Sequence, residues 1–388
     1  MHRSVYHGSR RGKGWRTERQ RILWLIKGLA RGGAERLVSV MAPRLQRSRY
    51  DVCVAYLLPE ADAFVPDLRS SDVEVVCLDA GRSVEPGWPR RLRALLRDEP
   101  FDIVHTHSPM PAAVARVLSP RRTRLVHTEH NMWDVYRAST FVANAVTYHR
   151  NDVVFAVSDR VADSIERPWW SRMGRTPDVE VLLHGVDPDT APRGPEARAR
   201  ARTALALAPD ALVIGNVANF SPKKDQHGLV EAFAMVRSEV PGVTLLLIGM
   251  GPLEEELRAT VTSQGLDDAV RFLGSRDDVP ALLPALDLFV LSSRYEGLPI
   301  SLLEAMAAEV ACVSTRVGGI PEALRDGVEG RLVPPSNAAA LAAALTDLLK
   351  DSNKRAALAT AGQRRVAAEF SIDGAVERTH ERYAQLLA

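Results

Sequence analysis

Two glutamates eight positions apart, Glu296 and Glu304, carry the clearest chemical signal in the sequence. Glu296 follows an apolar run typical of a buried strand, and Glu304 lies among Leu, Ala and Met residues typical of a helix. Gly297 permits a sharp turn between them, and Pro299 suits the start of that helix. Because carboxylates only accept hydrogen bonds, the pair could hold hydroxyl groups at two ends of one ligand, with free helix amides facing an anion. The alternative is a solvated helix face, which the apolar neighbours of Glu304 disfavour.

Two glycine-containing loops also follow predicted strands. The adjacent Gly32 and Gly33 precede one predicted helix, and the turn that contains Gly249 and Gly251 precedes another. Glycines at a helix N-terminus let backbone amides approach a phosphate closely, although each loop is equally compatible with a plain tight turn. Neither half of the chain opens with Gly-x-Gly-x-x-Gly and an acidic residue about 20 positions later, so a dinucleotide cofactor is disfavoured.

Lysine and histidine side chains lie beyond other predicted strands. Lys224 follows a strand in the loop that contains Asn219, where it could neutralise a diphosphate or be a solvated loop residue. Four histidines lie at or just past predicted strand ends: His105, His107, His127 and His130. The His-x-His spacing lacks a third ligand in a suitable position, so no metal site is predicted.

Strands and helices alternate along the chain. Such alternation predicts parallel sheets with helices on both faces, in which ligands bind beyond the carboxyl ends of the strands. Strands are expected at 21–27, 51–58, 73–78, 102–106, 124–128, 153–157 and 181–184, then at 211–217, 243–248, 270–273, 287–291, 310–314 and 331–333. Helices are expected at 34–47, 88–98, 160–167, 226–239, 252–264, 300–308 and 338–350, and the segment 355–388 is helical by composition.

These patterns divide the chain into five parts. Residues 1–19 are basic and poor in apolar residues, which predicts a disordered tail. An N-terminal Rossmann-like domain is expected over 20–188 and a C-terminal one over 210–370. Between them, the Pro-rich segment 189–209 breaks the alternation and is interpreted as a linker with a short helix. Residues 371–388 are expected to form a final helix.

Composition excludes several classes of protein. The 388 residues are 46% hydrophobic and 25% charged, which is typical of globular chains. No window has the roughly 18 apolar residues that a spanning helix needs, and no secretory signal precedes Arg21. The cysteines show no ligand or disulfide spacing, and they indicate core thiols of a reducing, cytoplasmic compartment: Cys53, Cys77 and Cys312.

Charge is divided unevenly between the two halves. Residues 1–188 carry 29 Lys and Arg against 22 Asp and Glu, a net charge of +7, whereas 189–388 carry 21 against 26, a net charge of −5. The basic residues are scattered and only 6% of residues are aromatic, so nucleic acid is a poor candidate partner. An anionic membrane surface or a phosphorylated substrate suits the first half better.

In their order along the chain, these motifs resemble those of the retaining glycosyltransferases of family 4, the group 1 type with the GT-B fold. The Glu-x7-Glu segment 296–304 is the signature, and the resemblance covers about residues 21–385. Further motifs in the second half are Gly249-x-Gly251-Pro252, Phe272-Leu-Gly274, Gly318-Gly319-Ile-Pro321-Glu322 and Gly327-x-x-Gly330-x-x-Val333-Pro. Those in the first half are Gly32-Gly33-Ala-Glu35-Arg36, Ala156-Val-Ser158 and His184-Gly185-Val-Asp187.

The resemblance implies two Rossmann-like domains facing a central cleft. The C-terminal domain would hold a nucleotide-diphosphate sugar and the N-terminal domain the acceptor, with the last helix returning to the N-terminal domain. The implied activity is hexosyl transfer to a saccharide or lipid-linked acceptor in cell-surface polysaccharide or glycolipid synthesis. No cofactor and no metal are expected, because positive charge and helix dipoles replace them. The enzyme would work in the cytoplasm, on the inner face of the membrane.

The resemblance also implies roles for single residues. Glu304 would bind the ribose hydroxyls and Glu296 the donor sugar near its O3. Lys224 would stabilise the departing diphosphate, with the amides of Gly33 facing it across the cleft. The triplet Thr128-Glu129-His130 resembles the family's Thr-x-His, so His130 is expected to contact donor sugar or acceptor, the alternative being a structural histidine. The other expected substrate-binding residues are Gly32, Asn219, Gly249, Gly251, Arg276, Gly297, Leu298 and Pro299.

Two positions depart from the family pattern. Asn219 stands where relatives often have Arg, which puts one phosphate contact in doubt, and His184 stands where Asn is common. The nucleobase positions around Ser275 and Arg276 do not distinguish uridine from guanosine.

The implied reaction is transfer with retention, and without an evident nucleophilic carboxylate a front-face path is favoured. The segment 167–172 with Trp169 and Trp170 suits a lipid-phosphate acceptor at a membrane, or else packs at the domain interface. Three alternatives remain: a sugar-nucleotide epimerase of the same fold, a non-catalytic partner subunit, and, least favoured, an NAD-dependent dehydrogenase.

Overall fold

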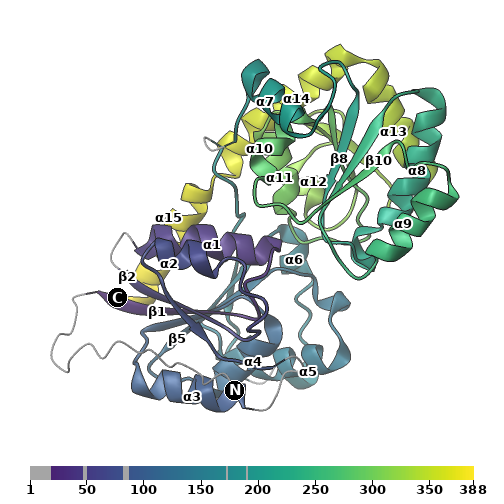
Figure 1. Ribbon diagram of the computed structural model, residues 1–388. Helices are drawn as coiled ribbons and strands as arrows, with labels where there is room; N and C mark the ends of the chain where they lie inside the picture. Colours follow the sequence, from purple (N-terminus) through teal and green to yellow (C-terminus); the bar gives the residue numbers. More distant parts are fainter. Residues whose placement is uncertain (1–18, 47–49, 82–86, 172–173, 189–190) are drawn as a thin grey trace, which may run out of the picture.

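The computed structural model describes residues 19–46, 50–81, 87–171, 174–188 and 191–388, which form two α/β lobes (Figure 1). Each lobe contains one parallel sheet with helices on both faces, which confirms the fold class. The basic tail predicted at the N-terminus lies outside the described residues, except for Arg19.

The first lobe has, in the described residues, a seven-stranded sheet of order β3-β2-β1-β4-β5-β6-β7. Its strands are β1 (Gln20–Ile26), β2 (Tyr50–Tyr56), β3 (Glu74–Cys77), β4 (Ile103–Thr106), β5 (Arg124–Glu129), β6 (Val153–Ala156) and β7 (Asp178–Val181). The strand predicted at 181–184 was therefore misplaced. β7 is a partly exposed edge strand, and the apolar residues that suggested it come after its end.

The second lobe has, over the part of the chain described, a six-stranded sheet of order β10-β9-β8-β11-β12-β13. Its strands are β8 (Val213–Val217), β9 (Thr244–Ile248), β10 (Val270–Gly274), β11 (Leu288–Leu291), β12 (Ala311–Thr315) and β13 (Gly330–Val333). In each sheet the strand order reverses beside the first strand, between β1 and β4 and between β8 and β11. Crevices at such reversal points are where open parallel sheets bind ligands.

The helices of the first lobe are α1 (Gly33–Gln46), α2 (Val65–Ser70), α3 (Trp88–Asp98), α4 (Pro109–Leu118), α5 (Ala138–Thr147) and α6 (Asp159–Asp163). Those that follow are α7 (Gly194–Ala204), α8 (Gln226–Glu239), α9 (Glu254–Ser263), α10 (Val279–Leu282), α11 (Ile300–Ala307), α12 (Ile320–Ala323), α13 (Ala338–Lys350), α14 (Ser352–Glu369) and α15 (Ile372–Leu387). α6 is shorter than its predicted range.

Half of the predicted linker is part of the second lobe. Arg198 and Arg202 of α7 form ion pairs with the buried Asp287 at 2.7 and 3.0 Å. The same carboxylate accepts a hydrogen bond from the backbone amide of Val213 at the start of β8. α7 is thus fixed to the edge where β8 and β11 begin.

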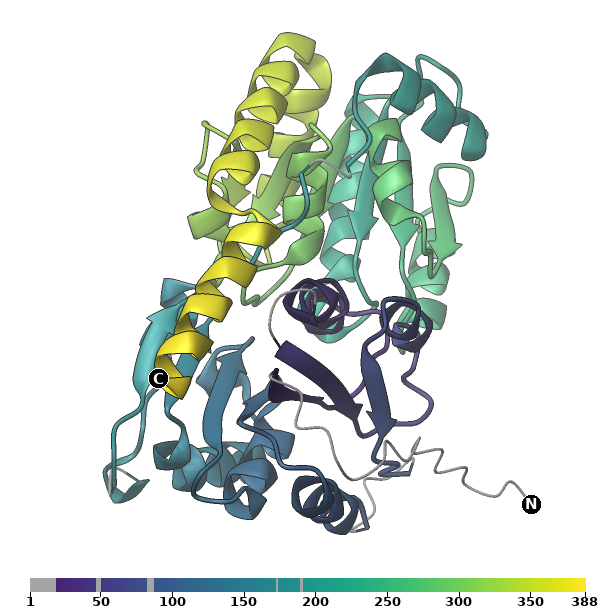
Figure 2. The ribbon, with the colours of Figure 1, turned by 90° about the vertical axis from the view of Figure 1, so that its left-hand side faces the viewer.

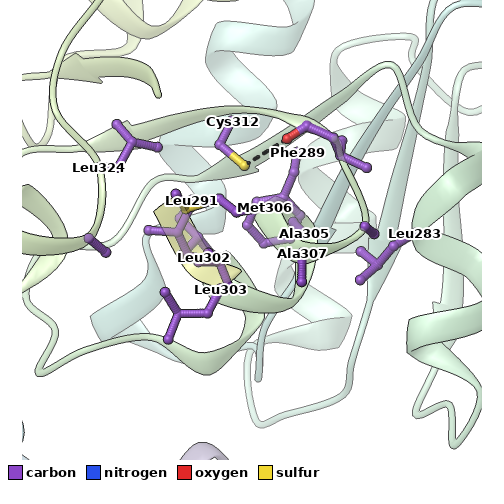
Figure 3. Packing of buried hydrophobic residues seen from close by; sticks show 14 of the residues in the cluster. Leu283, Phe289, Leu291, Leu302, Leu303, Ala305, Met306, Ala307, Cys312 and Leu324 are labelled. Carbon is purple, nitrogen blue, oxygen red and sulfur yellow. Dashed lines mark hydrogen bonds between the residues drawn. The ribbon is translucent and has the colours of Figure 1, made fainter. Parts of the chain in front are cut away.

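The cores explain the continuous apolar runs in the sequence. Strands of a parallel sheet are buried on both faces, so they show little alternation of apolar and polar residues. In the second lobe, Leu302, Leu303 and Met306 of α11 are fully buried beside Phe289 and Cys312 of the sheet (Figure 3). This packing fixes α11 against the carboxyl ends of the strands, where the predicted site lies.

The last helix crosses from one lobe to the other. α14 ends at Glu369 in the second lobe, and α15 then packs along the first lobe (Figure 2). The buried Tyr383 of α15 accepts a hydrogen bond from Trp24 Nε1 of β1 at 3.0 Å, and its hydroxyl also bonds His105 Nδ1. The C-terminal segment therefore belongs to the core of the first lobe.

Gly185 lies where the two crossing segments touch. Val186 pairs with Ser371, and a Cβ at position 185 would lie 1.9 Å from the carbonyl oxygen of Phe370. We expect Gly185→Ala to reduce the free energy of unfolding by about 1–3 kcal/mol, because both backbones must move apart. Urea unfolding measures this. An unchanged midpoint would show that the crossing adjusts freely.

Candidate active site

A cavity of about 480 Å³ lies between the lobes and is lined by both. It contains all the predicted site residues except Gly251: Gly32, Gly33, His130, Asn219, Lys224, Gly249, Arg276, Glu296, Gly297, Leu298, Pro299 and Glu304. They come from the loops after β1, β5, β8, β9, β10 and β11 and from α11, so the parallel topology brings them together.

Glu296 is a buried carboxylate held between two lysines. Lys224 Nζ pairs with its Oε1, and Lys223 Nζ lies 3.3 Å from its Oε2. Ser293 donates a hydrogen bond to Oε1 at 2.7 Å. Burial favours the neutral acid, but the two ammonium groups and the hydrogen bonds outweigh it and hold the pKa of Glu296 below its ordinary value. The cluster carries a net positive charge of one.

The loop after β8 is fastened to the loop after β11. Ser292 Oγ donates to the carbonyl oxygen of Lys224 at 2.8 Å, and the amide of Arg294 donates to that of Lys223. These bonds place both lysines beside Glu296 before any ligand binds.

Glu304 and Ser301 are three residues apart on α11, so they lie on the same face and line the cavity, whereas their apolar neighbours are buried. Burial raises the pKa of Glu304 to about 7, although Arg36 of α1 opposes the shift from across the cleft. The carboxyl is thus costly to ionise in the folded protein, and a hydroxyl-bearing ligand would offer it the hydrogen bonds that water supplies elsewhere.

This raised pKa has a consequence for stability. The folded state holds the proton of Glu304 more tightly than the unfolded state, so stability falls as the pH rises from about 4.5 to about 7. Glu304→Gln should therefore stabilise the ligand-free protein by about 3 kcal/mol at pH 8 and by far less near pH 5. Urea unfolding at the two pH values measures this. Equal midpoints of the two proteins at pH 8 would contradict it.

The glycine positions differ in what they allow. A Cβ at Gly33 would lie 3.6 Å from Ile300 of the opposite lobe, an ordinary contact. At Gly32 the same space holds the carboxylate of Glu35, an anionic group at the N-terminus of α1. Gly249, with φ of +143°, supports the turn after β9.

Gly251 has a different environment from the one predicted. A Cβ there would lie 2.2 Å from the carbonyl oxygen of Phe220, and Gly251 does not line the cavity. Its lack of a side chain lets the turn after β9 pack against the loop that carries Asn219, so it supports the site from behind.

A second group of contacts joins the lobes through other residues that line the cavity. Arg31, from the loop before α1, donates a hydrogen bond to Ser275 Oγ at 2.9 Å and forms an ion pair with Asp277. Asn219 Nδ2 lies 3.5 Å from the carbonyl oxygen of Arg31. Arg276 forms a two-bond ion pair with Asp278 at 2.6 and 2.7 Å. At this position relatives often have Arg. In this chain the side-chain amide of Asn219 contacts the opposite lobe instead.

The turn Gly297–Pro299 touches the first lobe directly. A Cβ at Gly297 would lie 2.3 Å from the carbonyl oxygen of His130, so only glycine permits this approach. His184 Nε2 lies 3.0 Å from the carbonyl oxygen of Leu298. The backbone at the end of β5 therefore abuts the turn that carries Glu296.

The predicted histidines fall into two groups. His105 bonds Tyr383 and Thr128, and His127 lies 3.2 Å from the buried carboxylate of Glu129, so both serve the core. His130 lines the cavity, and its Nε2 lies 3.3 Å from His107 Nδ1. Only His130 of these four lines the cavity among the residues that the structure describes.

No group of three or more His, Cys, Asp or Glu side chains in the described residues is arranged to hold a metal ion. No described helix is both long and apolar enough to cross a bilayer.

Both halves of the chain resemble known protein families. Residues 31–190 match the family model described as Glycosyltransferase Family 4, and residues 197–365 match that of Glycosyl transferases group 1. The D-inositol 3-phosphate glycosyltransferase of Salinispora arenicola (strain CNS-205) is 32% identical over 314 residues, which are 74% of this chain and 69% of that protein. The chain belongs to the family 4, group 1 glycosyltransferases. The predicted family and enzyme class are thus confirmed.

Further relatives agree with this assignment. The GDP-mannose-dependent alpha-(1-6)-phosphatidylinositol monomannoside mannosyltransferase of Mycobacterium tuberculosis (strain ATCC 25618 / H37Rv) is 29% identical to this glycosyltransferase over 364 residues, 88% of this chain and 92% of that protein. The crystal structure of Anabaena Alr3699/HepE in complex with UDP and glucose matches with a TM-score of 0.83 at 23% identity, covering 94% of this chain and all of that one. The latter likeness shows the fold.

Sequence reasoning missed several residues of the site of this glycosyltransferase. The sequence analysis gives Lys223 no role, although the doubled lysine at 223–224 is a visible sign of a second cation. Ser293 and Arg31 were not considered, because their contacts depend on how two loops and two lobes meet. Nothing in the sequence pairs Arg31 with Asp277, 246 positions away.

Proposed function

We propose that this glycosyltransferase moves a sugar from a nucleotide-diphosphate sugar to a hydroxyl of a saccharide or lipid-linked acceptor, with retention of anomeric configuration. The product would belong to cell-surface polysaccharide or glycolipid assembly. The observation that carries the proposal is the cluster of Lys223, Lys224 and Glu296 at one end of a cavity that has Glu304 in its wall.

The proposed roles follow from chemistry. Glu304 binds ribose hydroxyls, since an ionised carboxylate accepts two hydrogen bonds. Glu296 accepts from a hydroxyl of the donor sugar, and its fixed position follows from its bonds to both lysines. Lys224 stabilises the negative charge that develops on the diphosphate as it leaves. The charge is already present and oriented, so little reorganisation is needed during the reaction.

Retention is proposed to proceed on one face of the sugar. The bond between the sugar C1 and the diphosphate oxygen breaks, the acceptor oxygen bonds C1 on the same side, and the acceptor proton passes to the departing diphosphate. Four carboxylates line the cavity in the described residues. Glu296 is engaged by lysines, Asp277 pairs with Arg31, Glu35 lies in the first turn of α1, and Glu304 lies on α11. A double displacement would need a further carboxylate at the opposite face of the sugar.

The reaction is proposed to need no metal ion. Lys223, Lys224 and the start of α11 would supply the positive potential that a divalent cation supplies elsewhere. The donor is expected to lie with its diphosphate beside these groups and its nucleoside toward Glu304 and Arg276.

A panel of UDP-, GDP-, ADP- and dTDP-sugars tests the proposal, read by thermal stabilisation and by release of free nucleotide in the presence of EDTA. Stabilisation by one donor and slow nucleotide release are expected. Conversion of the free donor to its epimer without nucleotide release would favour an epimerase. If no donor stabilises the protein, the proposed donor site is wrong.

The acceptor is proposed to reach the first lobe from an anionic membrane surface. Trp169 is 82% exposed and Val117 67%, and Val142 and Val146 lie one turn apart on the outer face of α5. The exposed Arg122 follows α4 on the same lobe. Exposed aromatic and apolar side chains on a lobe that also exposes cations suit a lipid interface. Trp169 does not pack at the domain interface, the alternative considered from the sequence.

Vesicle co-sedimentation tests this contact with the full chain. Binding to vesicles with anionic lipid should exceed binding to neutral ones, and Trp169→Ala should reduce it about tenfold. Met250→Ala, which removes an exposed apolar side chain on the second lobe, is the matched control and should change nothing. Equal binding to both vesicle types would contradict the proposal.

A further inference from the structure

His184 connects the two lobes through one ring nitrogen. Its Nε2 lies 3.0 Å from the carbonyl oxygen of Leu298, in the turn of the proposed sugar site. A carbonyl oxygen only accepts, so the proton must be on Nε2. Burial lowers the pKa of His184 to about 4, so the ring is neutral near pH 7. Its Nδ1 therefore carries no proton and can only accept a hydrogen bond.

The other ring nitrogen of His184, Nδ1, is buried, and so is Nε2 of His107. In the described residues, neither His184 Nδ1 nor His107 Nε2 has a hydrogen-bond partner, and both rings are about 95% buried. Buried polar atoms without partners are rare, because each costs about 1–3 kcal/mol. Two such atoms on residues that line the same small cavity call for a shared partner.

A small internal cavity contains both side chains. Its volume is about 10 Å³, and its lining includes His105, His107, Thr128 and His184 together with apolar residues such as Leu182. This is about the space of one water molecule, and a buried water needs two to four polar partners. The site is both large enough and polar enough for one.

We propose that His184 and His107 share one internal water, and that this water fixes His130 relative to the turn Gly297–Pro299. His107 Nδ1 lies 3.3 Å from His130 Nε2, which completes a continuous chain. It runs from His130 through His107, the water and His184 to the carbonyl of Leu298. The inference rests on the proposed function and on the expected contact of His130, which lines the cavity, with the donor sugar or the acceptor. It gives His184 a positioning role at a place where relatives commonly have Asn.

The surroundings make the chain rigid. His107 stacks on His105 with ring centroids 4.3 Å apart and contacts Trp24 at 4.7 Å. His105 is in turn held by Tyr383 of the crossing helix α15. The packed ring of His107 therefore has little freedom to turn toward another partner.

A crystal structure of the full chain with a nucleoside diphosphate tests the water directly. The expected result is density for one water within hydrogen-bond distance of His107 Nε2 and His184 Nδ1. Absence of such density in a well-ordered cavity, or rings turned toward other partners, would overturn the inference. This result does not depend on turnover, so it is separable from a failure of the proposed function.

The variant His184→Gln tests the role of the water. Gln keeps an amide donor for Leu298 but places no acceptor at the position of Nδ1. It should lower kcat about tenfold, since the sugar contact is misplaced, and leave the Kd of the free nucleoside diphosphate within about twofold. Leu182→Val is the control, because it alters the wall of the same cavity without removing a member of the hydrogen-bond chain. It should leave kcat and the Kd unchanged. Equal losses of kcat in the two variants would mean that His184 acts only by filling space in the cavity wall, and would overturn the proposal.

Discussion

Replacing Lys224 by alanine should lower kcat by about two to three orders of magnitude while the affinity for the intact donor falls far less. Lys224 Nζ contacts Glu296 and is placed by the hydrogen bonds between the loops after β8 and β11. The diphosphate of the bound donor is already anionic and gains further negative charge as it departs, so we expect the loss to fall mainly on the transition state. Steady-state kinetics together with calorimetric donor binding measure the two effects separately.

Lys223→Ala is the matched control for this prediction. It removes a neighbouring ammonium that contacts the other oxygen of the same carboxylate, 3.3 Å away. We expect a smaller loss, about tenfold, because Lys223 also donates a hydrogen bond to Asn131 of the first lobe, so its ammonium group is shared between the two lobes. Equal losses in kcat and in binding for Lys224→Ala would mean that the lysine binds donor and transition state alike.

Replacing Glu304 by alanine should weaken donor binding by about 10- to 150-fold, which corresponds to about 1.5–3 kcal/mol for hydrogen bonds to a charged acceptor. Ser301 on the same helix face and the apolar contacts of α11 remain, so the fold should persist. Calorimetric titration with the donor identified in the panel measures the change. An unchanged Kd would remove Glu304 from the nucleoside site.

The ionisation of Glu304 gives an independent check. Burial raises its pKa to about 7, and the ionised form is the stronger acceptor for the two ribose hydroxyls. Donor affinity should therefore increase as the pH rises from about 6 to about 8, and Glu304→Gln should abolish this dependence. A pH profile identical in both proteins would show that another group titrates.

Much of the fold was predictable because its signals are local. The buried strands are continuous apolar runs in the sequence, because both faces of a parallel sheet are covered. The long helices α3, α8 and α13 have the predicted bounds, because helical periodicity is visible in the sequence. The edge strand β7 and the linker helix α7 were less well predicted. β7 has little buried surface, and α7 is fixed by the buried Asp287, nearly 90 positions from Arg198.

The site was predictable where each residue directly follows a strand. Topology alone brings the ends of parallel strands to one edge, so Lys224, Glu296 and Gly249 meet without further information. The missing part depends on how the lobes meet: the ion pair of Arg31 with Asp277, and the bond from His184 to Leu298. Gly251 was expected to contact the substrate, but its position is explained by close packing against the backbone of Phe220. A glycine in a turn can be required for either reason.

The most direct test of the central claim is to follow one reaction by proton NMR with the donor and an acceptor, counting released nucleoside diphosphate against new glycosidic bonds. The account predicts one nucleotide released for each bond formed, with the anomeric coupling of the product matching that of the donor. Nucleotide release with inversion, or with free sugar and no glycosidic bond, would contradict retaining transfer in the cavity that holds Lys224, Glu296 and Glu304.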